Sequence, residues 1–251
     1  MKLSAEIRYI DFHTHSAGGS SDTVAVRNLM AGDEAPADFS ANTLFSAGIH
    51  PWQLTDDNLG QMQTELLLTA AHPHVVVIGE AGFDRLRGAQ GEVQYRAFLF
   101  QAHIAAEMGK PVVIHCVKGW DELRRVRREV KPGRPWVIHG FRGSGSLAAS
   151  LAEEGFWFSL GAKGLTTEVL DSIYHEKLLL ETDDSGTQIS EVYRLFGAAA
   201  GYDEQRAESL VRNNFNAVFA RSVHFYRQHN SVVGKPDDFF QRIFPDVNGN
   251  Q

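Results

Sequence analysis

The sequence predicts an α/β fold in which parallel strands and helices alternate to form a TIM-type (β/α) barrel. The chain has 251 residues, the usual size of such a barrel. Short apolar runs alternate with helical patterns, as in successive βα units. Most of these runs end in a histidine or an acidic residue. An open doubly wound sheet also fits the alternation, but only a closed barrel brings so many strand ends to one mouth.

The expected strands are the short apolar runs, because parallel strands buried on both faces are near-continuous stretches rich in Val and Ile. In chain order these runs are Tyr9–His15, Thr23–Met30, Leu44–His50, Val75–Glu80, Pro111–His115, Trp136–His139, Phe156–Gly161 and Lys177–Asp183.

The expected helices follow the 3.6-residue periodicity between these runs. Leu59–Ala71 comes after a polar start signal at Thr55, and Gln94–Met108 is followed by Gly109 and Pro111, a typical helix end. The other expected helices are Asp121–Val130, Leu147–Glu154, Thr167–Tyr174 and Asp203–Phe219.

The first βα unit does not fit a regular barrel. A parallel crossover normally takes a dozen or more residues, and Ser16–Asp22 offers only seven. We therefore expect the barrel to lack its first outer helix, or to be distorted there. The chain is expected to be a single domain, residues 1–251, with the barrel core at about 8–220 and a docking tail at about 221–251.

Composition limits the location and the partners. The formal net charge is −7, whereas proteins that wrap duplex DNA have a basic footprint. A nucleic-acid substrate would therefore be held locally at one site. There is no run of about 20 apolar residues for a membrane span, no signal segment is apparent, and a single Cys, Cys116, excludes an intramolecular disulfide. We expect a cytoplasmic protein without a membrane partner; a monomer is compatible with the sequence, which does not indicate the oligomeric state.

Six residues at the ends of five expected strands have the chemistry of metal ligands. Singly, each could be a core histidine, a salt-bridge partner or a helix cap, but together at strand ends they indicate a metal centre. Six ligands are too many for one catalytic zinc and suit two cations about 4 Å apart. Nitrogen and oxygen ligands without thiolate favour zinc, manganese or iron over calcium, and magnesium is a further candidate. The six are His13, His15, Glu80, His115, His139 and Asp183.

Six ordered motifs resemble the TatD-type metal-dependent hydrolases of the amidohydrolase superfamily, over Asp11 to about Phe219. The family shows D-x-H-x-H, G-x-H-P, G-E-x-G-L-D, P-V-x-I-H, H-x-F-x-G and E-T-D. Here these motifs are Asp11–His15, Gly48–Pro51, Gly79–Asp84, Pro111–His115, His139–Gly143 and Glu181–Asp183.

The resemblance implies a role for each ligand. One cation would be held by His13, His15 and Asp183, and the second by His115 and His139, with Glu80 bridging both.

The resemblance also implies catalytic and substrate-binding residues. Glu80 and Asp183 would be catalytic, Asp183 by managing a proton. His50 and Asp84 would lie on the substrate side of the mouth. The implied substrate is a phosphodiester, most simply a DNA end.

Three departures from the family concern the substrate loops. The segment between the first two motifs is shorter than in the family. Lys118 lies where the family usually has part of Ser-Arg-Asp after His115, and Arg142 replaces a serine. Lys118, Arg142 and Arg85 are candidates for phosphate contacts, with a plain surface role as the alternative for each.

Two other functions remain open from the sequence. The same site would suit hydrolysis of a carboxylic ester or amide, including an aminoacyl ester on tRNA. A non-catalytic metal-binding relative is the third possibility, although an intact set of six ligands argues against it.

Overall fold

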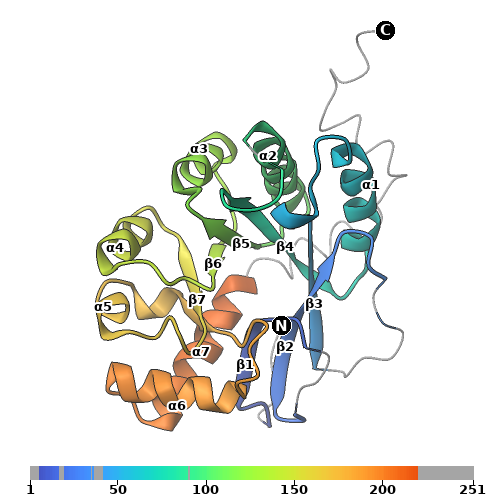
Figure 1. The fold of residues 1–251 in the computed structure, drawn as a ribbon. Coiled ribbons are helices and arrows are strands. Elements are labelled where there is room, and N and C mark those ends of the chain that lie inside the picture. Colours follow the sequence, from blue (N-terminus) through green and yellow to red (C-terminus); the bar gives the residue numbers. More distant parts are fainter. Residues whose placement is uncertain (1–5, 17–19, 35, 37–41, 90, 220–251) are drawn as a thin grey trace, which may run out of the picture.

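The computed structural model describes residues 6–16, 20–34, 36, 42–89 and 91–219. The expected docking tail, 221–251, lies outside these residues. Eight strands form one sheet in chain order, and each pairs in parallel with the next (Figure 1). They are β1 (Tyr9–Thr14), β2 (Thr23–Met30), β3 (Thr43–Gly48), β4 (Val75–Asp84), β5 (Val112–Val117), β6 (Trp136–His139), β7 (Trp157–Leu160) and β8 (Leu178–Leu180).

The sheet closes on itself where β8 runs out beside β1. Asp183, just beyond β8, donates its backbone N–H to the carbonyl of His13 at 2.9 Å and accepts from the N–H of His15 at 3.2 Å. A parallel bridge joins Thr14 to Asp183. These bonds confirm the predicted barrel over the open doubly wound sheet.

Helices surround the barrel on its outer side (Figure 1). They are α1 (Leu59–Ala70), α2 (Glu92–Glu107), α3 (Trp120–Val130), α4 (Gly145–Glu153), α5 (Thr167–Leu170), α6 (Ile189–Ala200) and α7 (Glu204–Phe219), with short 3₁₀ turns η1 (Pro51–Gln53) and η2 (His175–Lys177).

The helices differ from the expected ones in two places. Helix α6 was missed, although its buried residues Ile189, Val192, Phe196 and Gly197 follow helical spacing. The expected helix Thr167–Tyr174 ends at Leu170. The Leu170 carbonyl, at the helix end, accepts from the Ile173 N–H at 3.4 Å and lies 3.1 Å from Nε2 of His175, and the chain then turns toward β8.

The first part of the barrel is shortened, as predicted. No helix occurs between β1 and β2, or between β2 and β3, in the stretches of those connections that the structure describes. Strands β2 and β3 still pair in register over six residues, from Ala25–Thr43 to Met30–Gly48. The described helices include none long and apolar enough to cross a membrane.

Aromatic and branched side chains fill the core on both sides of the strands. Trp136 on β6 is 1% exposed and its ring lies 5.3 Å from that of Phe98 on α2, edge to face. Such burial on both faces is why the parallel strands appear in the sequence as continuous apolar runs. It also fixes the strand ends rigidly, and the polar residues beyond them form the site.

Candidate metal centre

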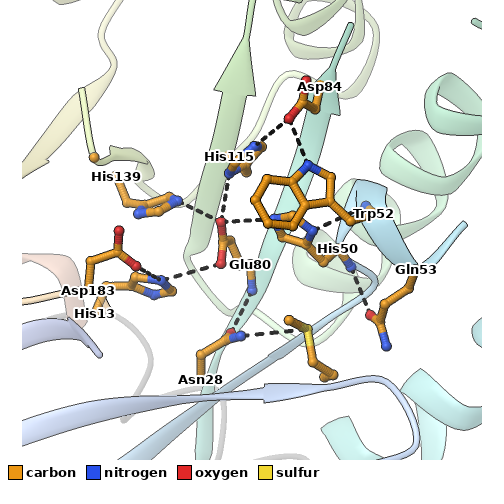
Figure 2. Close-up of polar contacts among 12 residues, drawn as sticks. His13, Asn28, His50, Trp52, Gln53, Glu80, Asp84, His115, His139 and Asp183 are labelled. Atoms are coloured by element: carbon orange, nitrogen blue, oxygen red, sulfur yellow. Dashed lines mark hydrogen bonds and ion pairs between the residues drawn. The ribbon is translucent and has the colours of Figure 1, made fainter. Parts of the chain in front are cut away.

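Glu80 lies at the centre of a cluster of imidazoles at the carboxyl ends of the strands (Figure 2). Its side chain is 4% exposed. The Oε1 atom is 2.7 Å from Nε2 of His139, 2.8 Å from Nδ1 of His115 and 3.2 Å from Nε2 of His50. One carboxylate oxygen therefore faces the histidines from β3, β5 and β6.

The other oxygen of Glu80 faces the histidines of β1. Oε2 lies 3.4 Å from Nε2 of His13 and 3.5 Å from Nε2 of His15. The same two ring nitrogens lie 3.7 and 3.5 Å from Oδ1 of Asp183. The carboxylate of Glu80 thus stands between two groups of ligand atoms.

Three groups of side chains could each hold a cation, since the ligand atoms within each group lie within 4.8 Å of one another. All six residues that the sequence predicted as ligands occur in these groups, together with His50. The groups are His13, His15 and Asp183; His13, Glu80 and His139; and His50, Glu80 and His115.

The backbone before Glu80 is held by β2 and β3. The Glu80 N–H donates to Oδ1 of Asn28 at 2.9 Å, and the Ser46 hydroxyl donates to the same oxygen at 3.0 Å. Gly48 is needed here because a Cβ would lie 2.5 Å from the carbonyl oxygen of Glu80. Close contact between β3 and β4 therefore positions the central carboxylate.

His50 caps the η1 turn and is fixed in one tautomer. Its Nδ1 accepts from the Trp52 backbone N–H at 3.1 Å, while the backbone N–H of His50 donates to Oε1 of Gln53 at 3.1 Å. Because Nδ1 accepts, the ring proton of a neutral His50 is on Nε2, which then donates to Glu80. In this arrangement His50 orients Glu80 and is not a free nitrogen ligand.

Asp183 adopts a left-handed backbone, φ 55°, which Asp tolerates better than most residues. Its neighbour Thr182 donates its N–H and hydroxyl to the two oxygens of Asp11 at 2.9 and 2.6 Å. Burial raises the pKa of Asp11 to about 7. The Asp11 carboxyl therefore ties β1 to the β8 end rather than facing the cluster.

The pKa values in the cluster are set by burial and by the close contacts between carboxylates and imidazoles. Burial raises the pKa of Glu80, but the charge of His139 and a hydrogen bond from His115 outweigh it and hold that pKa well below its usual range. Burial lowers the pKa of His139, while the carboxylates of Glu80 and Glu181 raise it well above its usual value. A hydrogen bond to Glu80 raises the pKa of His15.

Unsatisfied buried nitrogens show that the cluster fits a cation. Among the described residues, both ring nitrogens of His13 are buried without a hydrogen-bond partner. Buried polar atoms in proteins are nearly always paired. Neutral imidazoles around a carboxylate are the ligands that zinc and similar cations take, so the residues present fit the metal.

The candidate substrate-binding residues differ in their exposure to solvent. Lys118 and Arg142 are exposed, and neither forms an ion pair with any residue that the structure describes. Arg85 pairs with Glu122, so its guanidinium would have to leave this carboxylate to contact a phosphate. Asp84 is 3% exposed.

Asp84 lies behind His115. Its Oδ2 accepts from Nε1 of Trp52 at 2.7 Å and lies 3.5 Å from Nε2 of His115. Burial raises the pKa of Asp84, but hydrogen bonds from Trp52, from the Leu86 N–H and from His115 together outweigh it, and the pKa is lowered. Asp84 orients the His115 ring so that Nδ1 faces Glu80.

The sequence analysis gives no role to three neighbours of the cluster: Asn28, Trp52 and Glu181, the last of which belongs to the Glu181–Asp183 motif. Asn28 is a polar residue in an apolar run, a pattern that could have indicated a buried hydrogen-bonding role. Glu181 is fully buried; its Oε1 accepts from the Gly140 N–H at 2.7 Å and lies 3.5 Å from Nδ1 of His139. A carboxylate on the far nitrogen orients a ligating histidine.

We expect Glu181→Gln to weaken metal binding about 10- to 100-fold, the usual cost of losing such a partner. Glutamine keeps an acceptor for Gly140 but removes the charge that faces His139. Titration against a competing chelator measures the change. Exposed Glu153→Gln is the control, and equal metal affinities of the two variants would contradict the role.

Comparison with known proteins identifies relatives. The family model described as TatD related DNase matches residues 21–220, which begins after the Asp11–His15 motif. A 3'-5' ssDNA/RNA exonuclease TatD from Escherichia fergusonii is 35% identical over 151 residues, 55% of this chain and 56% of that protein. The matched part thus spans little more than half of that relative. An uncharacterized metal-dependent hydrolase TatD from Mycobacterium tuberculosis is 28% identical over 69% of this chain and 78% of its own.

Solved structures show the same fold. A TatD homologue from Escherichia coli K12 superimposes with a TM-score of 0.70 at 20% identity, over 86% of this chain and 99% of the other. A hydrolase TatD family protein from Entamoeba histolytica gives 0.69 at 16% identity, over the same shares. At these identities the likeness concerns the barrel alone.

Proposed function

Since the chain belongs to the TatD-related DNase family, we propose that it is a divalent-metal-dependent hydrolase that cleaves phosphodiester bonds at the ends of DNA strands. The observation that carries the proposal is Glu80, whose two oxygens face separate groups of imidazoles. A carboxylate between two ligand groups is what a binuclear hydrolytic site requires.

We propose the following ligand sets. Each set takes one oxygen of Glu80. When bound, two divalent cations would lower the pKa of a water and stabilise the charge that develops on the phosphate. The first set is His13, His15 and Asp183 with Oε2 of Glu80; the second is His115 and His139 with Oε1.

Asp183 is the proposed proton acceptor. Its side chain is 25% exposed, in contrast to the fully buried His13. Oδ1 faces the β1 histidines, and Oδ2 makes no hydrogen bond with the residues that the structure describes. Oδ2 can therefore accept the proton of the attacking water at the mouth.

Phosphodiester cleavage is favoured by the names of the relatives, which include 3'-5' ssDNA/RNA exonucleases. The exposed Lys118 directly follows β5, which carries His115, and the exposed Arg142 lies three residues after His139, the last residue of β6. Cations at this position suit a charged diester better than a neutral ester.

We expect Lys118→Ala and Arg142→Ala each to raise KM for a charged diester by up to about fivefold, the value of one exposed ion pair, and to weaken its salt dependence. KM for a neutral ester should stay unchanged. Lys131→Ala is the matched control, since Lys131 is exposed and shares the left-handed backbone of Lys118, φ 49° against 58°. Equal losses on both substrates would indicate a structural role.

One experiment tests the function. Purified protein is analysed for metal content and assayed with bound zinc, manganese or magnesium on single-stranded DNA, a small phosphodiester, a carboxylic ester and an aminoacyl-tRNA. Cleavage of the diesters supports the proposal. Cleavage of only the esters would show that the substrate is a carboxylic ester and not a phosphodiester. Tight metal binding without turnover would indicate a non-catalytic relative.

A further inference from the structure

An exposed tryptophan lies beside the candidate metal centre. Trp52 is 50% exposed, whereas Trp136 in the core is 1% exposed. Its ring centroid is 4.8 Å from that of His50 and 5.7 Å from that of His115. Figure 2 shows the indole between Asp84 and His50. Exposing half of a large apolar ring is unfavourable, so the position calls for an explanation.

The indole is held rigidly although it is exposed. Its Nε1 donates to Oδ2 of Asp84 at 2.7 Å, and its backbone N–H donates to His50. Pro51, which is buried, restricts the backbone of the same turn. A ring fixed from both ends loses little conformational entropy when a second ring stacks on it.

A cation lies against the same ring. The Arg87 guanidinium carbon is 4.6 Å from the Trp52 ring centroid, a cation–π contact. Arg87 forms no ion pair with any carboxylate in the described part of the chain. Half of the indole still reaches solvent with Arg87 in place.

We propose that Trp52 is the platform on which the nucleobase next to the scissile phosphodiester stacks. The proposal rests on the proposed function and deepens it by naming a residue that selects single-stranded nucleic acid over simple diesters. Bases stack on exposed aromatic rings without regard to sequence, and a nearby arginine strengthens such sites. A nucleotide's base and phosphate are one sugar apart, which matches a ring that is the direct neighbour of His115.

An alternative role for Trp52 is to hold Asp84, and through it His115. The two roles predict different results for two variants of Trp52. Trp52→Phe keeps an aromatic ring but removes the Nε1 donor, whereas Trp52→Ala removes both. Tyr174→Ala is the control, because Tyr174 is a similarly exposed aromatic residue, at 53%, before η2 and therefore at the amino end of β8.

The test measures binding by fluorescence anisotropy in the presence of a chelator, so that no strand is cleaved. The probes are a fluorescein-labelled oligothymidylate and the same strand with abasic residues at both ends. We expect Trp52→Ala to weaken binding of the base-bearing strand about tenfold, within the range for loss of one stacked base, and to leave the abasic strand unaffected. Trp52→Phe and Tyr174→Ala should both stay within about threefold of the parent.

Three results would overturn the proposal: a parent that shows no preference for the base-bearing strand, a Trp52→Ala effect that is equal on both strands, or a Trp52→Phe effect as large as that of Trp52→Ala. Because binding is measured without metal, the outcome is separate from catalysis. A protein that prefers the base-bearing strand but cleaves no phosphodiester in the substrate assay would refute the proposed function and leave the platform standing.

Discussion

Glu80→Gln is expected to abolish turnover while leaving the fold intact. The loss should exceed about a hundredfold, the upper range for residues that merely orient metal ligands, because Glu80 is the residue that both ligand groups share. One oxygen would remain an acceptor for His115 or His139, but the negative charge that would offset the two proposed cations would be gone.

The measurement is kcat/KM on the diester that the parent cleaves best, with metal content determined on the same samples. Circular dichroism and Tm establish that the variant is folded, and Glu153→Gln serves as the control for loss of a carboxylate on the exposed side of α4. We expect a lower metal content together with the loss of activity. Activity within about threefold of the parent would remove Glu80 from its bridging role.

The strands and the candidate ligands could be predicted because they depend on local sequence. An acid or a histidine that closes an apolar run lies in the carboxyl-terminal part of a strand in a parallel barrel. Glu80 and His115 do so, although β4 continues beyond Glu80 to Asp84 and β5 beyond His115 to Val117. His13 and His15 project to the same side because residues i and i+2 of a strand do. These rules need no knowledge of the neighbouring strand, so the six ligands could be predicted from local sequence alone.

The contacts that orient the ligands could not be predicted, because they depend on the register between strands. Asn28 reaches the Glu80 N–H only because β2 and β4 both lie against β3. Trp52 meets Asp84 through a turn whose direction is set by the cap at His50. The sequence shows each of these residues but not which of them meet.

The two helical errors have different causes. The pattern of α6 is present in the sequence, from Ile189 to Gly197. The early end of α5 was not visible, because it depends on His175 folding back onto the Leu170 carbonyl while Tyr202 bonds its other ring nitrogen at 2.8 Å. A helix end fixed by residues that follow it at a distance leaves no local signal.

The two proposed cations should leave the protein in order, with the cation at His115 and His139 leaving first. Beyond their shared Glu80, the β1 set adds Asp183 to its two histidines, while the other set has two histidines alone. His50 does not make up the difference, because its Nε2 carries the proton that it donates to Glu80. The site with fewer ligands binds its metal more weakly.

Acid should remove metal in the same order. Cations bind neutral imidazole, and the pKa of His139 is raised well above its usual value in the metal-free protein. A proton therefore competes for His139 even near neutral pH, and this competition strengthens as the pH falls. His15, whose pKa is also raised, meets the same competition, but its set retains His13 and the Asp183 carboxylate.

Stepwise chelation tests this order, with metal content and activity measured on the same aliquots at neutral and at mildly acidic pH. We expect activity to fall with the first equivalent removed, and the fall to begin at lower chelator concentration at the lower pH. His139→Ala should bind a single equivalent with nearly the affinity of the parent's tighter site, and His13→Ala should lose that tighter site. Full activity with one equivalent per chain would show that the second set is not needed, and the binuclear assignment would then be withdrawn.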